Sequence, residues 1–217
     1  MAKTLRFGAL GITLAVALAL PGTSHAQERN DTWGGVTTAT AVASLATSVL
    51  MPRVFYSSPE ATVGWRARWH VSVLAPTMTQ FAFAMLNELA LKEAFKEPRP
   101  GCEETGPGIE NCETFALFST QSYIAGGALG QGVATFLVDT IKYSGGRFNF
   151  GGFAGEVLLP LALTGVTVAG RSAGHFETFG QSIASAGVGL GTGLIVGLIY
   201  STMQAPECGY SGNLICW

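Results

Sequence analysis

The sequence predicts an all-α fold, a membrane-associated bundle of about five to six helices. Hydrophobic residues make up 48% of the 217 residues and charged residues only 12%, about half of the roughly 25% that is usual in soluble domains. Long apolar stretches follow one another, and polar or Gly- and Pro-rich segments separate them. The alternation of apolar and polar residues that is typical of half-buried strands does not appear over any length.

Residues 1–26 have the layout of an export signal. Lys3 and Arg6 precede an uncharged apolar run at 7–20, and the small residues Ser24 and Ala26 suit a cleavage site after residue 26. An uncleaved first membrane helix is the alternative, although the run falls short of the ~20 residues that a span needs. We therefore expect a single helical domain at 27–217 in the cell envelope, in the inner membrane with its site facing the periplasm or free in the periplasm.

Five apolar stretches follow the signal, and each is long enough for a helix. They cover residues 34–51, 72–95, about 115–141, about 153–169 and about 180–203. Pro- and Gly-containing segments separate them, including the turn signal Ser144-Gly145-Gly146. In the fifth stretch Gly189, Gly193 and Gly197 recur every four residues, a pattern that lets helices approach closely.

Four cysteines fall into two local pairs, Cys102 with Cys112 and Cys208 with Cys216. In an exported chain such pairs predict two disulfides. Zinc is the competing interpretation, but CxxC spacing and nearby His are lacking, so no metal and no cofactor is expected. If the last helix spans the membrane, the second pair emerges on the cytoplasmic side, where it would stay reduced.

The net charge of −2 gives no basic footprint for nucleic acid. The basic residues that stand out are Lys92 and Arg99, at the end of an expected helix, and Pro100 follows Arg99. Lys offers a point charge and Arg a planar fork, a combination that suits phosphate. A solvated basic helix end is the alternative, because cations also favour helix C-termini.

Two later segments carry polar side chains at expected helix ends. Phe118-Ser119-Thr120-Gln121 lies at the start of the third stretch, where hydroxyl and backbone N–H groups suit an anion. The segment 170–177, between the fourth and fifth stretches, contains Arg171, His175 and Glu177. In an alternating bundle all three segments can meet on one face.

The order of these segments resembles the type 2 phosphatidic acid phosphatase and vanadium haloperoxidase superfamily. Its motifs are Lys-x6-Arg-Pro, Pro-Ser-Gly-His and Ser-Arg-x5-His-x3-Asp. The first is complete at 92–100, the second keeps only Ser119, and the third keeps Arg171. The resemblance covers about residues 70–203 and implies an all-α bundle.

The resemblance implies that Lys92, Arg99, Ser119 and Arg171 bind the phosphoryl group. Gln121 occupies the place of the general acid, and an amide cannot release a proton near pH 7. Counting from Arg171 places Glu177 at the nucleophilic His. A two-residue deletion would let His175 attack phosphorus with Glu177 as its orienting carboxylate.

Two functions follow from these residues. The first is a phosphatase that acts on a phosphomonoester, such as a phosphorylated small molecule or lipid, through a phosphohistidine intermediate. The second is a catalytically impaired relative that binds a phosphorylated ligand or has a structural role in the envelope. Only His70 and His175 remain once the signal is removed, so the chain lacks one of the two histidines at their usual places.

Overall fold

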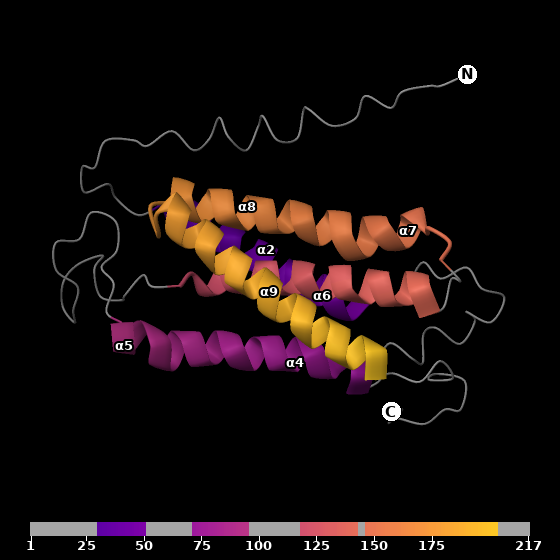
Figure 1. Ribbon diagram of the computed structural model, residues 1–217. Helices are drawn as coiled ribbons and strands as arrows, with labels where there is room; N and C mark the ends of the chain where they lie inside the picture. The colour runs from indigo at the N-terminus through magenta and orange to yellow at the C-terminus, as the bar shows by residue number, and fades with distance from the viewer. Residues whose placement is uncertain (1–29, 51–70, 96–117, 143–145, 204–217) are drawn as a thin grey trace, which may run out of the picture.

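The computed structural model describes residues 30–50, 71–95, 118–142 and 146–203, and all regular elements within them are helical. This confirms the predicted all-α class, with five helical rods in the described part of the chain (Figure 1). Three of the rods are the single helices α2 (Asp31–Leu50), α6 (Thr120–Lys142) and α9 (Phe179–Met203). The other two contain a π-turn each: α4 (Val71–Leu86), η2 (Asn87–Leu91) and α5 (Lys92–Phe95) form one, and α7 (Phe150–Phe153), η3 (Ala154–Leu158) and α8 (Leu159–Ala173) form the other.

Successive rods run in opposite directions along the bundle (Figure 1), so each rod has one of its ends at the same end of the bundle. Hydrogen bonds tie this end together. The Asn30 N–H at the start of α2 donates to Gly174 O beyond α8 (3.3 Å), and the Ser119 N–H before α6 donates to Ser185 Oγ of α9 (2.8 Å). We call this the site end, because the predicted site residues that the structure describes lie there. The opposite, distal end holds the last turn of α6 and the start of α7.

Local sequence explains where the helices begin. Asn30 caps α2 by accepting from the Thr32 and Trp33 N–H groups, and Asn149 caps α7 in the same way. At α9, Thr178 Oγ1 accepts from the Gln181 N–H (3.1 Å), while Gln181 Oε1 accepts from the Thr178 N–H (2.8 Å). This reciprocal arrangement is a capping box, and it satisfies two N–H groups that an α-helix cannot bond internally.

The most extensive contact in the bundle is between α6 and α9. A Cβ at Gly189 would overlap the carbonyl oxygen of Tyr123, and one at Gly193 would overlap that of Gly127. From the other side, a Cβ at Gly130 would overlap the carbonyl oxygen of Leu190. The predicted small-residue face is therefore the seam along which these two backbones touch, as in membrane helix pairs.

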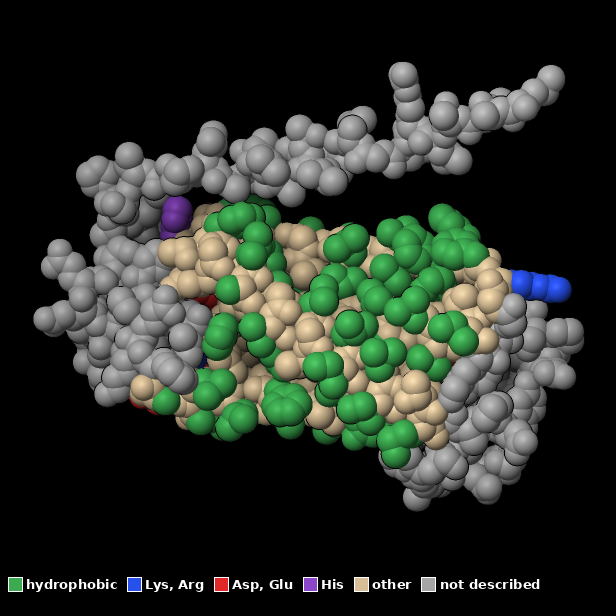
Figure 2. All heavy atoms as spheres, in the orientation of Figure 1, with side chains coloured by type: hydrophobic (Ala, Val, Ile, Leu, Met, Phe, Trp, Pro, Cys, Tyr) green, Lys and Arg blue, Asp and Glu red, His purple; other side chains and the backbone are tan. Residues whose placement is uncertain are grey.

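Three helices are long and apolar enough to cross a membrane, namely Thr120–Ile141, Phe150–Ala173 and Phe179–Met203. Hydrophobic side chains are spread along the whole length of the face of the bundle shown in Figure 2. Leu89, Ile195 and Ile141, for example, are 60–71% exposed. The core, in contrast, is made largely of Ala, Gly, Ser and Thr. Apolar residues outside and small or polar residues inside are what a bilayer solvent favours, and this supports the predicted membrane association.

Candidate functional site

Lys92 is placed at the site end by the rod of α4, η2 and α5. Its side chain is buried, and its Nζ lies 2.7 Å from Oε2 of Glu88, one helical turn earlier. The same Glu88 oxygen accepts a hydrogen bond from Thr120 Oγ1 at the start of α6. Glu88 therefore joins the cation to the second predicted motif.

The π-turn η2 brings a neighbouring amide to the same place. Asn87 is buried, and its Nδ2 donates to Phe118 O (3.0 Å) and to Thr120 Oγ1 (3.1 Å). A π-turn adds one residue to a helical turn, which changes the direction of the side chains on either side of it. Asn87 and Glu88 can therefore both reach the start of α6, although they are adjacent in sequence.

Ser119 is the N-cap of α6, in agreement with the predicted helix start. Its Oγ accepts from the Ser122 N–H (3.3 Å), and the residue is fully buried. Its own N–H donates to Ser185 Oγ, which in turn donates to Gln181 O (2.6 Å). Hydroxyl groups of the chain thus occupy hydrogen-bonding positions at this helix terminus that an anion would otherwise use.

Arg171, near the end of α8, forms a buried ion pair at the site end. Its Nε donates to Oε2 of Glu177 (3.1 Å), and its Nη2 donates to Oε1 of the same carboxylate. Both side chains are buried, at 6% and 1% exposed. Ser182 Oγ also donates to Glu177 Oε2 (3.3 Å), and the guanidinium lies over the Phe176 ring, 4.4 Å from its centre. The carboxylate therefore binds Arg171 in the bidentate geometry that Arg also uses for phosphate.

His175 lies in the turn between α8 and α9 with a positive φ of 58°. The Phe176 N–H donates to Arg171 O and the His175 N–H to Ser172 O, both at 3.1 Å. These two bonds define a Schellman motif, in which the residue at the position of His175 adopts the left-handed conformation that Gly usually provides. The helix end therefore accounts for the backbone of His175.

The side chain of His175 is partly exposed and forms no hydrogen bond with the described residues. The Glu177 carboxylate, which was expected to orient it, lies on Arg171 instead. Gln121, at the predicted general-acid position, is partly exposed in the first turn of α6. The structure thus gathers Lys92, Ser119 and Arg171 at one end without placing a carboxylate on the imidazole.

Several predicted residues lie outside the described residues. They are Arg99, Pro100, the export signal at 1–26 and the four cysteines Cys102, Cys112, Cys208 and Cys216. These predictions stay predictions. The segment that contains Cys102 and Cys112 joins α5 to α6 at the site end, whereas α9 ends at the opposite end of the bundle (Figure 1).

Both buried cations of the described site end lie next to a carboxylate. Lys92 pairs with Glu88, and Arg171 pairs with Glu177. A phosphate bound between these cations would have to share their N–H donors with these carboxylates or displace one of them. Because Arg171 and Glu177 are both withdrawn from water, removing one partner leaves an uncompensated buried charge.

The residues that hydrogen-bond to the predicted site residues were not identified from the sequence. Two sequence spacings do indicate some of them. Glu88 and Lys92 stand four residues apart in a helix, the spacing of a side-chain ion pair. Thr178 and Gln181 show the Thr-x-x-Gln spacing of a capping box, which places Ser182 and Ser185 in the first turns of α9. The pairing of Arg171 with Glu177 has no such signal, because it depends on the path of the turn.

A second polar region lies nearer the distal end. Glu156 in the π-turn η3 is 3% exposed and lines a small pocket with Gln131 and Thr135 of α6 and with Thr47 and Ser48 of α2. Asp139 of α6 is also buried, at 3% exposed. The described residues include no group of three or more His, Cys, Asp or Glu side chains suited to a metal ion.

The fold and the site end together define a class of protein, an all-α bundle with candidate membrane-spanning helices and a buried ion pair at one end. Comparison with protein-family models, with curated proteins and with solved structures finds no match for the chain.

Proposed function

We propose that this protein is an integral membrane protein related to the phosphatidic acid phosphatase type, in which the chain's own carboxylates hold the phosphate-binding cations and phosphate esters are not turned over. The observation that carries this proposal is the buried, bidentate pairing of Arg171 with Glu177. Lys92 is engaged by Glu88 through a single contact, in which the carboxylate is partly exposed. In this proposal the protein serves as a structural bundle of the cell envelope.

Three further features support the absence of turnover. Glu177 stands at the counted position of the nucleophile, and a carboxylate that already accepts from Arg171 and Ser182 is not available to activate His175. The left-handed turn accounts for the backbone conformation of His175, so this conformation needs no catalytic role to explain it. Gln121 cannot act as a general acid.

Replacing Glu177 by Gln should expose a latent anion site. The substitution keeps the shape of the side chain and leaves the buried Arg171 without a counter-charge. In detergent solution we expect inorganic phosphate or vanadate to raise the Tm of Glu177→Gln but not that of the wild type, because only the variant has a cation to neutralise. Glu93→Gln, an exposed substitution one residue from Lys92, is the matched control and should behave as the wild type. An equal rise in Tm for wild type and Glu177→Gln would contradict the proposal.

A phosphatase that uses His175 is the second candidate, because Lys92, Ser119 and Arg171 lie at one end of the bundle. Its test is hydrolysis of an activated aryl phosphate by the wild type and by His175→Gly, a substitution that suits the positive φ at this position. We expect no turnover by either protein. Turnover by the wild type that His175→Gly abolishes would instead establish the phosphohistidine mechanism.

Charge along the chain supports an orientation with the site end outside the cytoplasm. The sequence that joins helix ends at the distal end carries four basic residues, Arg53, Arg66, Arg68 and Arg147, and Lys142 is the last residue of α6. The segment 96–117, which joins α5 to α6 at the site end, carries two basic residues, Lys96 and Arg99, and five glutamates. Basic loop residues favour the cytoplasmic side of a membrane, so the distal end is assigned to that side.

The orientation can be measured with reporter fusions. Green fluorescent protein fused after the last residue of the chain should fluoresce, because α9 ends on the cytoplasmic side and this reporter matures there. The same reporter inserted after Gly108, in the segment 96–117, should stay dark while full-length protein accumulates in the membrane. The reverse pattern would overturn the orientation, and fluorescence from both fusions would show that the bundle does not span.

A further inference from the structure

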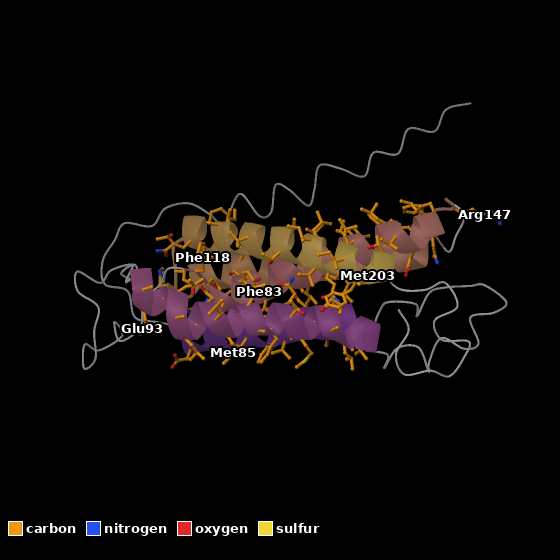
Figure 3. All side chains as sticks on the ribbon, turned by 60° about the horizontal axis from the view of Figure 1, so that its bottom comes forward. Phe83, Met85, Glu93, Phe118, Arg147 and Met203 are labelled. Atoms are coloured by element: carbon orange, nitrogen blue, oxygen red, sulfur yellow. The ribbon has the colours of Figure 1, made fainter. Side chains whose placement is uncertain are left out.

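The turn that joins α6 to α7 presents two aromatic rings and a cation at the tip of the bundle. Phe148 is 63% exposed and Phe150 is 68% exposed, and the neighbouring Arg147 is exposed as well. Figure 3 shows Arg147 at the end of the molecule opposite to Glu93 and Phe118, which mark the site end. Neither the proposed site nor the core uses these three side chains.

Hydrogen bonds hold the described part of this turn, residues 146–149, at both ends. Gly146 adopts a φ of +80°, a conformation that favours glycine, and its N–H donates to Thr140 O (2.9 Å). Asn149 accepts from the N–H groups of Gly151 and Gly152 and so begins α7 directly after the turn. The backbone on both sides of Phe148 is thereby held by hydrogen bonds.

A cluster of aromatic rings positions Phe148 further. Its ring centre lies 5.7 Å from that of Phe136, in an edge-to-face arrangement, and 5.4 Å from that of Phe153. Phe136 belongs to α6 and Phe153 to α7, so the cluster clamps the two helix ends together. One edge of Phe148 packs against protein, and the rest of the ring faces outward at a defined place.

The position of the turn indicates that lipid contacts its outer surface. It joins two candidate spans, Thr120–Ile141 and Phe150–Ala173, and therefore lies where the hydrocarbon of a bilayer gives way to head groups. Ile141, at the end of the first span, is 71% exposed on the apolar side of this boundary. Aromatic rings with an adjacent Arg suit this boundary, because the rings enter the acyl region while the guanidinium binds a lipid phosphate.

We infer that Arg147, Phe148 and Phe150 form a phospholipid-binding anchor, in which Phe148 and Phe150 insert among acyl chains and Arg147 binds the phosphate of an anionic head group. The anchor sets the depth of the distal end in the bilayer. This inference requires the bundle to be in a membrane, but it is independent of its orientation and of the state of the anion site.

The anchor can be tested by photo-crosslinking in proteoliposomes. The full chain carries benzoylphenylalanine in place of Phe148 or, in a second variant, Phe150, in vesicles of phosphatidylcholine alone or with about a third phosphatidylglycerol, which is anionic. Mass spectrometry after irradiation should find the protein enlarged by one phospholipid. In each variant, the ratio of phosphatidylglycerol adducts to phosphatidylcholine adducts should be about five times the ratio of the two lipids in the vesicles. That ratio corresponds to the ~1 kcal/mol that one basic residue gains near an anionic surface.

Two controls separate the anchor from mere insertion into the membrane. Adding Arg147→Gln to the Phe148 variant should reduce the capture of phosphatidylglycerol to its share of the lipid while adducts persist. Benzoylphenylalanine at Ile195, which is 60% exposed in the middle of α9, should capture lipid without preference. Lipid adducts at Ile195 but not at Phe148 and Phe150 would overturn the anchor and leave membrane insertion standing. Covalent dimers from Phe148 would assign the surface to a second copy, and a preference that survives Arg147→Gln would remove the phosphate contact.

Discussion

Gly189→Ala is expected to lower the stability of the bundle by about 1–3 kcal/mol or more. The added Cβ would fall on the carbonyl oxygen of Tyr123, and a backbone atom cannot move aside as the end of a flexible side chain can. Helix propensity acts in the opposite direction, because Ala is favoured over Gly by about 1 kcal/mol within a helix. The steric term wins, since the α6–α9 seam can relieve the overlap only by separating two helices along their length.

Gly187 provides the matched control on the same helix. A Cβ added there meets nothing within 4 Å, so Gly187→Ala should be neutral or stabilising by up to about 1 kcal/mol. Thermal unfolding in detergent micelles, followed by circular dichroism, measures both variants against the wild type. If the two substitutions changed the Tm by the same amount, α9 would not pack on α6 through its Gly189 face.

Glu177→Leu is expected to cost about 3–5 kcal/mol, because it leaves the Arg171 guanidinium buried without a counter-charge. Arg171→Met should cost a similar amount for the converse reason. The double variant should recover much of the loss, since two apolar side chains of similar volume replace a buried ion pair at little net cost. Unfolding of the four proteins forms a double-mutant cycle that isolates the coupling between the two side chains.

The pair of Lys92 and Glu88 serves as the comparison. Glu88 is 43% exposed, so solvent screens this pair and Glu88→Gln should cost well under half as much as Glu177→Leu. The two single substitutions Arg171→Met and Glu177→Leu each have a cost in stability. If these two costs simply added in the double variant, the two charges would not be coupled. The carboxylate would then not occupy the anion position on Arg171, and the proposed function would lose its main support.

Much of the fold could be predicted, because helix periodicity and helix ends are local properties of the chain. The stretch predicted at 180–203 is observed at Phe179–Met203, and that predicted at 72–95 is observed at Val71–Phe95. The stretch predicted at 153–169 extends further at both ends, to Phe150–Ala173. Asn149 accounts for the earlier start, since it caps α7 with its side chain, and the Schellman turn at His175 accounts for the later end.

The sequence by itself determined the helical class, the apolar stretches long enough for a membrane and the small-residue face of α9, since composition and spacing along a helix set all three. It also determined which residues carry charge near helix ends. Only the tertiary structure decided how those charges are used. Arg171 meets Glu177 and Ser182 because the turn after α8 reverses the chain, and Lys92 reaches Thr120 through Glu88 because of a π-turn. A carboxylate and a phosphate satisfy the same guanidinium, so the residue types alone do not reveal the pairing of Arg171 with Glu177, and only the positions of the side chains show it.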